Sequence, residues 1–158
     1  MMSTLKESVN DFLAQERIAV AGVSRSGDAA ANLIYRKLRD AGFQVFAVNP
    51  NAEEVEGDTC YANISSIPHG VDGVVIATQP QVTDQIVREC ADAGVSHIWM
   101  HRSFGQGSVS TEAVNYCREK KITVIPGGCP MMFCEPVDFG HKCMRWILNL
   151  TGGLPKQV

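Results

Sequence analysis

The sequence predicts a doubly wound α/β domain, in which a mainly parallel sheet lies between two layers of helices. Short apolar segments typical of buried strands alternate with longer segments whose apolar residues recur at helical spacing. Nearly every segment ends at Gly, Pro, Asn or Thr, which interrupt regular structure. With 158 residues, the chain suits one domain spanning 1–158, including an N-terminal extension of about residues 1–14.

The first half contains three predicted strands. Residues 17–23 form a buried strand, and apolar residues at helical spacing follow between positions 33 and 41. Gly42 suits the end of that helix. A second strand, 43–48, stops at Asn49-Pro50, and the mixed stretch 51–68 is expected to hold one short strand or turn near Cys60. Residues 71–77 form the third strand.

The second half repeats the alternation. A helix is predicted from the apolar residues at 82, 86, 87, 90 and 91, before Gly94. The strand 95–100, a helix around 109–117 and the strand 122–125 follow. A last helix carries apolar residues from 137 to 150 and ends at Gly152-Gly153. The first dozen residues are expected to form a helix that packs on the outside.

This order predicts a Rossmann-like, three-layer αβα fold, because parallel neighbours require crossover helices on both faces of the sheet. Ligands of such sheets bind outside the carboxyl ends of the strands, near the point where the strand order reverses. The predicted binding rim is therefore made of loops at 22–28, 49–51, 78–80, 101–105 and 127–130.

The loop from Gly22 to Gly27 is the best candidate for a phosphate site. It joins a strand to a helix, so its backbone and the helix N-terminus can face a phosphate, with Ser24, Arg25 and Ser26 adding side-chain contacts. A tight turn without a ligand is the alternative. Lys-Ser or Lys-Thr does not follow Gly27, which excludes a Walker A loop, and Ser24 replaces the second glycine of G-x-G-x-x-G.

The end of the second strand argues against a nicotinamide dinucleotide. Such a site favours an acidic residue there to bind the ribose hydroxyls, whereas this chain has Asn49-Pro50. Glu53 and Glu54 lie further along and resemble a solvated turn. An NAD(P)-binding oxidoreductase or redox-sensing module is thus the second interpretation of the site.

The chain resembles the small stand-alone CoA-binding proteins, which are similar to the N-terminal domain of the succinyl-CoA synthetase alpha subunit. The resemblance covers about residues 18–133 and lies in the order of five short motifs. These are Gly22-Val23-Ser24-Arg25, Val48-Asn49-Pro50, Ala77-Thr78-Gln79-Pro80, Ile98-Trp99-Met100 and Cys129-Pro130-Met131-Met132. It implies a fold that binds coenzyme A or an acyl-CoA, with phosphates at the Gly22 loop, the nucleotide beside Asn49 and Pro50, and adenosine or pantetheine along Thr78, Gln79 and Pro80.

Two positions depart from the family pattern. Asn51 stands where many members have a lysine that can pair with phosphate, and 101–105 reads HRSFG where the family often has Gln then Gly. Our hypothesis is that Arg102 restores the missing cation. We therefore include His101 and Arg102 among the predicted ligand-binding residues.

No catalytic constellation is recognisable, so a non-catalytic binding or regulatory protein is our first interpretation. His101 ends a strand at the binding edge and could act as a base. Cys129 lies near the strand ends and is the other candidate, so an acyl-CoA transferase or hydrolase using either residue is the third interpretation. Cys129, Cys134, His141 and Cys143 do not have a usual zinc-ligand spacing, and no metal is predicted.

Composition limits the partners and the location. The formal net charge of -3 disfavours a protein that coats nucleic acid. The N-terminus lacks a secretory pattern and no apolar run is long enough to cross a bilayer, so we expect a cytoplasmic protein without a membrane contact. Trp146, Ile147, Leu148 and Leu150 on the last helix fit either a homodimer contact or packing onto the sheet, and a homodimer is slightly favoured. An unidentified partner enzyme is another possible associate.

Overall fold

The computed structural model describes residues 3–158, and its sheet confirms the predicted fold class. Seven strands lie in the order β3-β4-β2-β1-β5-β6-β7. All neighbouring pairs are parallel except β3 with β4. The strands are β1 (Arg17–Ala21), β2 (Gln44–Val48), β3 (Glu54–Val55), β4 (Asp58–Tyr61), β5 (Gly73–Ile76), β6 (His97–Met100) and β7 (Thr123–Pro126).

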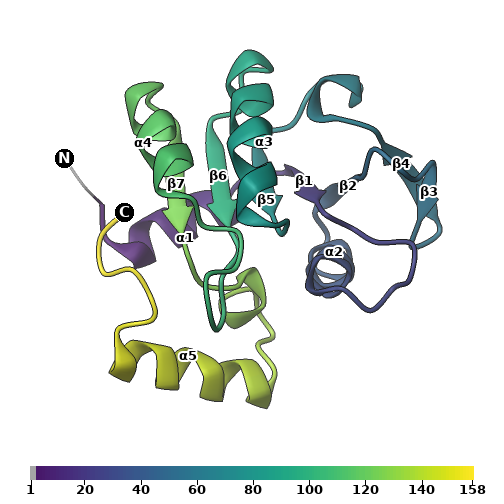
Figure 1. Cartoon of the computed structure of the whole chain (residues 1–158). Helices are drawn as coiled ribbons and strands as arrows, with labels where there is room; N and C mark the ends of the chain where they lie inside the picture. Colours follow the sequence, from purple (N-terminus) through teal and green to yellow (C-terminus); the bar gives the residue numbers. More distant parts are fainter. Residues whose placement is uncertain (1–2) are drawn as a thin grey trace.

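Helices connect the strands as the alternation predicts (Figure 1). The predicted short strand near Cys60 is β4, and β3 adds an antiparallel edge that the sequence did not suggest. The helices are α1 (Leu5–Leu13), α2 (Ala30–Asp40), α3 (Pro80–Asp92), α4 (Thr111–Glu119) and α5 (Phe139–Thr151), with short 3-10 helices η1 (Ile64–Ser66) and η2 (Pro130–Met132).

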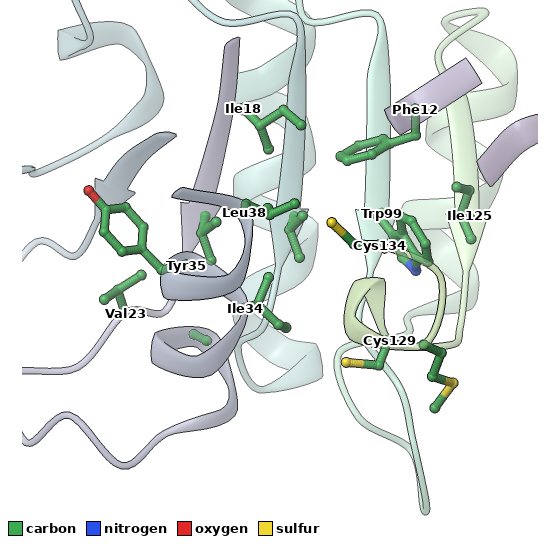
Figure 2. Packing of buried hydrophobic residues seen from close by; sticks show 14 of the residues in the cluster. Phe12, Ile18, Val23, Ile34, Tyr35, Leu38, Trp99, Ile125, Cys129 and Cys134 are labelled. Atoms are coloured by element: carbon green, nitrogen blue, oxygen red, sulfur yellow. The ribbon is translucent and has the colours of Figure 1, made fainter. Parts of the chain in front are cut away.

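The sheet has a packed core on each face. Along β1, Ile18 and Val20 point to one face, whereas Ala19 and Ala21 point to the other, as the two-residue period of a strand requires. The first face packs against α1, α2, η2 and Leu148 of α5, and Figure 2 shows part of this cluster. The second face packs against α3, α4 and η1. This arrangement accounts for the continuous apolar strands in the sequence.

The predicted N-terminal helix is present as α1, and it packs in the core on the first face of the sheet, called here the first core. Thr4 and Glu7 make a capping box at its start. The Phe12 ring is buried and meets Trp99 edge-on, with 5.4 Å between ring centroids (Figure 2). It also lies over Gly73, where a Cβ would come within 3.0 Å of the ring. The extension therefore lies outside the sheet, as expected, but is packed as part of the domain.

The strand order reverses beside β1. The chain passes from β1 to β2 and β4 on one side, then returns to place β5, β6 and β7 on the other. The carboxyl ends of β1 and β5 therefore border the crevice where ligands of open α/β sheets bind. None of the helices formed by residues 3–158 has the length and apolar character that a bilayer crossing needs.

Candidate functional site

A cleft of about 240 Å³ lies at this switch point. It is bordered by the ends of β1, β2 and β5 and by one face of α3. Its lining residues are Ala21, Gly22, Val48, Asn49, Pro50, Ala62, Thr78, Val82, Gln85, Ile86 and Glu89. Four of the predicted ligand-binding residues, Gly22, Asn49, Pro50 and Thr78, are thus brought together from three loops.

Gly22 lets the first loop leave the sheet. Its φ of +103° is a conformation that residues with side chains rarely adopt. A Cβ at this position would lie 2.4 Å from the carbonyl oxygen of Ala77, which follows β5. The backbones that leave β1 and β5 can therefore approach each other closely only because position 22 is glycine.

The rest of the Gly22 loop is held by the buried side chain of Asn32 on α2. Its Oδ1 accepts from the Ser24 N–H at 2.8 Å, and its Nδ2 donates to the Ser24 carbonyl at 2.7 Å. The Ser24 hydroxyl in turn accepts from the Ser26 N–H at 3.2 Å. These bonds fix the loop in a defined curve, as a preformed binding site requires.

Glu56, between β3 and β4, extends this network. Its carboxylate accepts from Asn32 Nδ2 and from Arg36, each at 2.7 Å, and Arg36 also donates to the Gly27 carbonyl at 3.2 Å. The hydrogen bond from Asn32 and the one from Arg36 lower the pKa of Glu56. The short β3-β4 edge is thereby tied to the loop that begins at Gly22.

Asn49 joins the loops after β1 and β2. Its Nδ2 donates to the Val23 carbonyl at 2.9 Å, and its Oδ1 accepts from the Asn51 N–H at 2.8 Å. Val23 itself is buried in the first core, so its contribution to the site is its backbone. Asn49 therefore holds one wall of the cleft in place, a role that an acidic residue without the amide donor could not fill.

The loop after β5 is held in place by hydrogen bonds from Ser108 and Thr83. The Ser108 hydroxyl donates to the Thr78 carbonyl at 2.6 Å, and the buried Thr83 hydroxyl donates to the Ser108 carbonyl at 2.7 Å. Gln79 is exposed and Pro80 begins α3. The connection from β6 to α4 thus supports the loop that carries Thr78.

The two helices beside the switch point begin without side-chain caps. Ala29 precedes α2 and Gln79 precedes α3, and neither side chain bonds the first turn. By contrast, Thr4, Ser110 and Asp138 cap α1, α4 and α5. The Asn32 and Val82 N–H groups already donate to the Ala29 and Gln79 carbonyls, and Pro80 has no N–H. The remaining N–H groups of each first turn have no side-chain cap, and a helix N-terminus favours an anion.

Arg25 is the predicted cation of this loop. It is exposed and takes no part in the four ion pairs found among residues 3–158. Arg25 and Ser26 belong to the loop that enters α2, but neither lines the cleft itself. Their contact with a ligand therefore stays a prediction.

His101 and Arg102 lie outside the cleft lining. The His101 ring is near the Ser103 hydroxyl, at 3.4 Å, and burial, followed by the electrostatic effect of the nearby His141, lowers the pKa of His101. The Arg102 backbone pairs with Gly128, and its guanidinium donates to the Gly153 carbonyl at 3.4 Å. Arg102 thus contacts the C-terminal segment, and the idea that it replaces the lysine missing at position 51 stays a prediction.

Cys129 is enclosed rather than presented at the surface. It lies just before η2, and its side chain is buried among apolar residues (Figure 2). Burial raises the pKa of its thiol to about 11. The thiolate needed for nucleophilic attack is therefore scarce at neutral pH. Within residues 3–158, no three His, Cys, Asp or Glu side chains are grouped so as to hold a metal ion.

Four residues of α3 line the cleft but were not predicted as site residues. They are Val82, Gln85, Ile86 and Glu89. Their i, i+3, i+4, i+7 spacing places them on one helix face. Val82 and Ile86 support the helix prediction, whereas Gln85 and Glu89 resemble ordinary solvent-facing residues in the sequence. The helical spacing of these four residues is the one feature of the sequence that could have placed Gln85 and Glu89 on the same face as Val82 and Ile86.

A larger groove, of about 800 Å³, lies between α1 and the segments around α5. Leu5, Val9 and Phe133 contribute apolar walls, and Lys6 and Lys156 contribute cations. It contains none of the predicted ligand-binding residues and is away from the switch point. We therefore assign the candidate site to the smaller cleft.

The family described as CoA binding domain matches residues 16–135 of this chain. The uncharacterized protein YneT of Bacillus subtilis is 26% identical over 130 residues, which cover 82% of this chain and 93% of that protein. The ADP-forming acetate–CoA ligase II of Archaeoglobus fulgidus is 32% identical over 90 residues, covering 55% of this chain but 13% of the ligase. The chain therefore corresponds to a small part of that enzyme.

Solved structures of related proteins have a similar fold. A hypothetical protein from Pyrococcus horikoshii has a TM-score of 0.76 and 26% identity, covering 83% of this chain and 90% of that one. The dinucleotide-forming acetyl-coenzyme A synthetase 1 of Candidatus Korarchaeum cryptofilum, in complex with phosphate and ADP, has a TM-score of 0.61 and 28% identity. That match covers 70% of this chain and 25% of the synthetase.

Proposed function

This chain belongs to the CoA-binding domain family, and we propose that it binds coenzyme A or an acyl-CoA at the switch-point cleft as a non-catalytic binding or regulatory protein. The observation that carries the proposal is the close approach of two backbones at Gly22. A Cβ there would collide with Ala77, so only glycine keeps these two loops close together. A glycine directly after the first strand of such a fold supports a phosphate site at this loop.

The residues present fit such a ligand. We assign the phosphates to the Gly22 loop, with Ser24, Arg25 and Ser26, and to the uncapped start of α2. Pro50 and the apolar side chains of Val82 and Ile86 suit the flat face of a base, while Gln85 and Glu89 offer polar atoms. Thr78, Gln79 and Pro80 border the remaining part of the ligand.

The acid–base properties favour binding over catalysis. A buried Cys129 with a raised pKa is a poor nucleophile. Among residues 3–158, the hydrogen bond found for the His101 ring is to Ser103, with no carboxylate bound to orient it. Ser103 lies between the two residues, within 3.4 Å of the His101 ring and bonded to the Cys129 thiol. We propose that these contacts hold both side chains in place and that neither residue acts on the ligand.

The first experiment is a thermal-shift panel of CoA, acetyl-CoA, NAD, NADP and ATP. A ligand at 100 times its dissociation constant stabilises the folded state by about 2.7 kcal/mol. We expect stabilisation by CoA species alone. A shift with NAD or NADP instead would support the dinucleotide alternative, and no shift with any ligand would overturn the proposed function.

A pair of arginine variants locates the ligand. Arg25→Ala should weaken CoA binding about 10- to 150-fold, the range for losing one charge-assisted phosphate contact, without lowering the melting temperature of the free protein. Arg118→Ala removes an exposed cation on α4, far along the chain from the loop, and should bind CoA normally. Equal losses in both variants would contradict the assignment.

A turnover assay separates binding from catalysis. Acetyl-CoA incubated with the protein should lose its thioester no faster than acetyl-CoA in the buffer control. Thioester loss that disappears in His101→Ala or Cys129→Ala would instead support the transferase or hydrolase alternative. A cytoplasmic location and an associated enzyme remain expectations from the sequence.

A further inference from the structure

Helix α5 has two apolar faces, although one of them packs against the rest of the protein. Leu148 is its buried residue, and Met144 packs partly against the first core. Phe139, Trp146, Ile147 and Leu150 are large and exposed. Surface helices normally place polar residues opposite the core, so a helix that is apolar on both sides is expected to be covered on both.

Four residues form a straight line on the exposed side. Phe139, Cys143, Trp146 and Leu150 are spaced by four, three and four residues, which is the spacing of a coiled-coil seam. At about 100° per residue they centre on the side of α5 opposite Leu148. We call these four residues the outer stripe. In Figure 1, α5 lies along the lower edge of the molecule with no other helix beyond it.

We propose that the outer stripe is the contact between two copies of this chain, packed through antiparallel α5 helices. The residues are arranged to complement themselves. When two such stripes pair about their midpoint, Phe139 faces Leu150 of the other copy and Cys143 faces Trp146. A small side chain thus meets the largest one, which lets the two helices interlock.

The exposed apolar area supplies more than half of what such a contact needs. Phe139 is 82% exposed, Trp146 65% and Leu150 68%. Together with Ile147 beside them, these residues offer on the order of 500 Å² of mostly apolar surface. A stable complex buries about 800 Å² on each partner. The stripe therefore supplies the centre of the interface, and the neighbouring polar side chains of α5 supply its rim.

The mass of the intact chain in solution tests this contact. Sedimentation equilibrium should give twice the 17.2 kDa of one chain. Trp146→Glu should give the mass of one chain, because it buries a charge in the seam, while its circular dichroism stays that of wild type. Leu33→Glu replaces an apolar residue of α2 that is 43% exposed and should remain a dimer.

Cys143 provides a second, covalent measurement. It is the one cysteine of the six that is not buried. In the antiparallel pair, Cys143 of one chain lies about 10 Å from Cys143 of the other, because the axes of packed helices are 8–10 Å apart. A short bismaleimide should therefore give a covalent dimer from wild type and from Leu33→Glu. The dimer should be lost in Cys143→Ser and in Trp146→Glu.

Three results would overturn the proposal. They are the mass of a single chain at every concentration, a dimer unaffected by Trp146→Glu, or a monomer that floats with phosphatidylcholine–phosphatidylserine vesicles through the same residues. The last would assign the outer stripe to a lipid surface. The dimer does not rest on the proposed function, because CoA stabilisation is measured separately and either result can fail while the other holds.

Discussion

Gly22 shows how one residue sets the geometry of the site. An alanine there would combine a disfavoured φ with a Cβ only 2.4 Å from the Ala77 carbonyl oxygen. We expect Gly22→Ala to lower the free energy of unfolding by about 2–4 kcal/mol and to weaken CoA binding. Chemical denaturation measures the first effect and calorimetric titration with CoA the second.

Gly42 is the matched control for this variant. It also has a positive φ, +95°, but a Cβ there would meet nothing within 4 Å. Gly42→Ala should therefore cost about 1–2 kcal/mol, the backbone term alone, and should leave CoA binding intact. Equal costs in the two variants would mean that the close approach to Ala77 relaxes easily.

Glu56 makes a stability contribution that depends on pH. Its pKa in the folded protein lies below the unfolded value of about 4.3, so its contribution is present above that pH and is lost as the pH falls through the folded pKa. Glu56→Gln should destabilise the protein by about 1–2 kcal/mol at pH 7, where the pair with Arg36 is lost.

The pH series distinguishes this ion pair from a simple packing effect. The difference between wild type and Glu56→Gln should shrink as the pH falls below about 4, because wild type then loses the same charge. Glu53→Gln, at an exposed position in the same stretch, should track wild type throughout. A difference that is constant with pH would show that the carboxylate charge is not responsible.

At the scale of elements, η2 and α5 give their cysteines opposite environments. Cys129 precedes η2 and is buried with a pKa raised to about 11, whereas Cys143 lies on the outer face of α5. Iodoacetamide at pH 8 should therefore label Cys143 well before Cys129, as peptide mass spectrometry would show. Fast labelling of Cys129 would revive its role as a nucleophile.

The same labelling experiment also reports on the proposed dimer. If the outer stripe pairs two chains, Cys143 should label more slowly in the dimer than in Trp146→Glu, since the partner helix covers it. Cys129 should react at the same slow rate in both proteins. Unfolded protein should label all six cysteines and sets the upper limit.

At the scale of the whole molecule, α1 closes the first core at the end away from the cleft. The N-terminal and C-terminal segments pair there, because Ser3 and Val158 exchange backbone hydrogen bonds of 3.1 and 3.0 Å. Phe12→Ala should cost about 3–5 kcal/mol, the usual effect of removing a buried Phe ring. Phe104→Ala removes an exposed ring and should cost little.

Ligand binding should be separable from this loss. The melting temperature of Phe12→Ala should fall, yet the further stabilisation by CoA should remain, because the cleft residues come from other elements. Loss of CoA stabilisation in a variant that is still folded would show that α1 and the cleft are coupled.

The sequence by itself determined the alternation of strands and helices, the glycine at position 22 and the rim loops after the strands. Each of these follows from local chemistry: apolar segments bounded by turn residues, and a glycine directly after a strand. Asn49 was expected at the binding rim and lines the cleft, but its bond to the Val23 carbonyl joins residues distant in the sequence and could not be foreseen.

Only the tertiary structure decided which of the predicted residues face the cleft. It brought Gln85 and Glu89 of α3 to the cleft and placed Arg102 against Gly153. It buried Phe12 and left Phe139 of α5 exposed, although both are aromatic residues of terminal helices. The physical reason is that helical periodicity identifies the faces of a helix, whereas the packing of distant segments decides which face is covered.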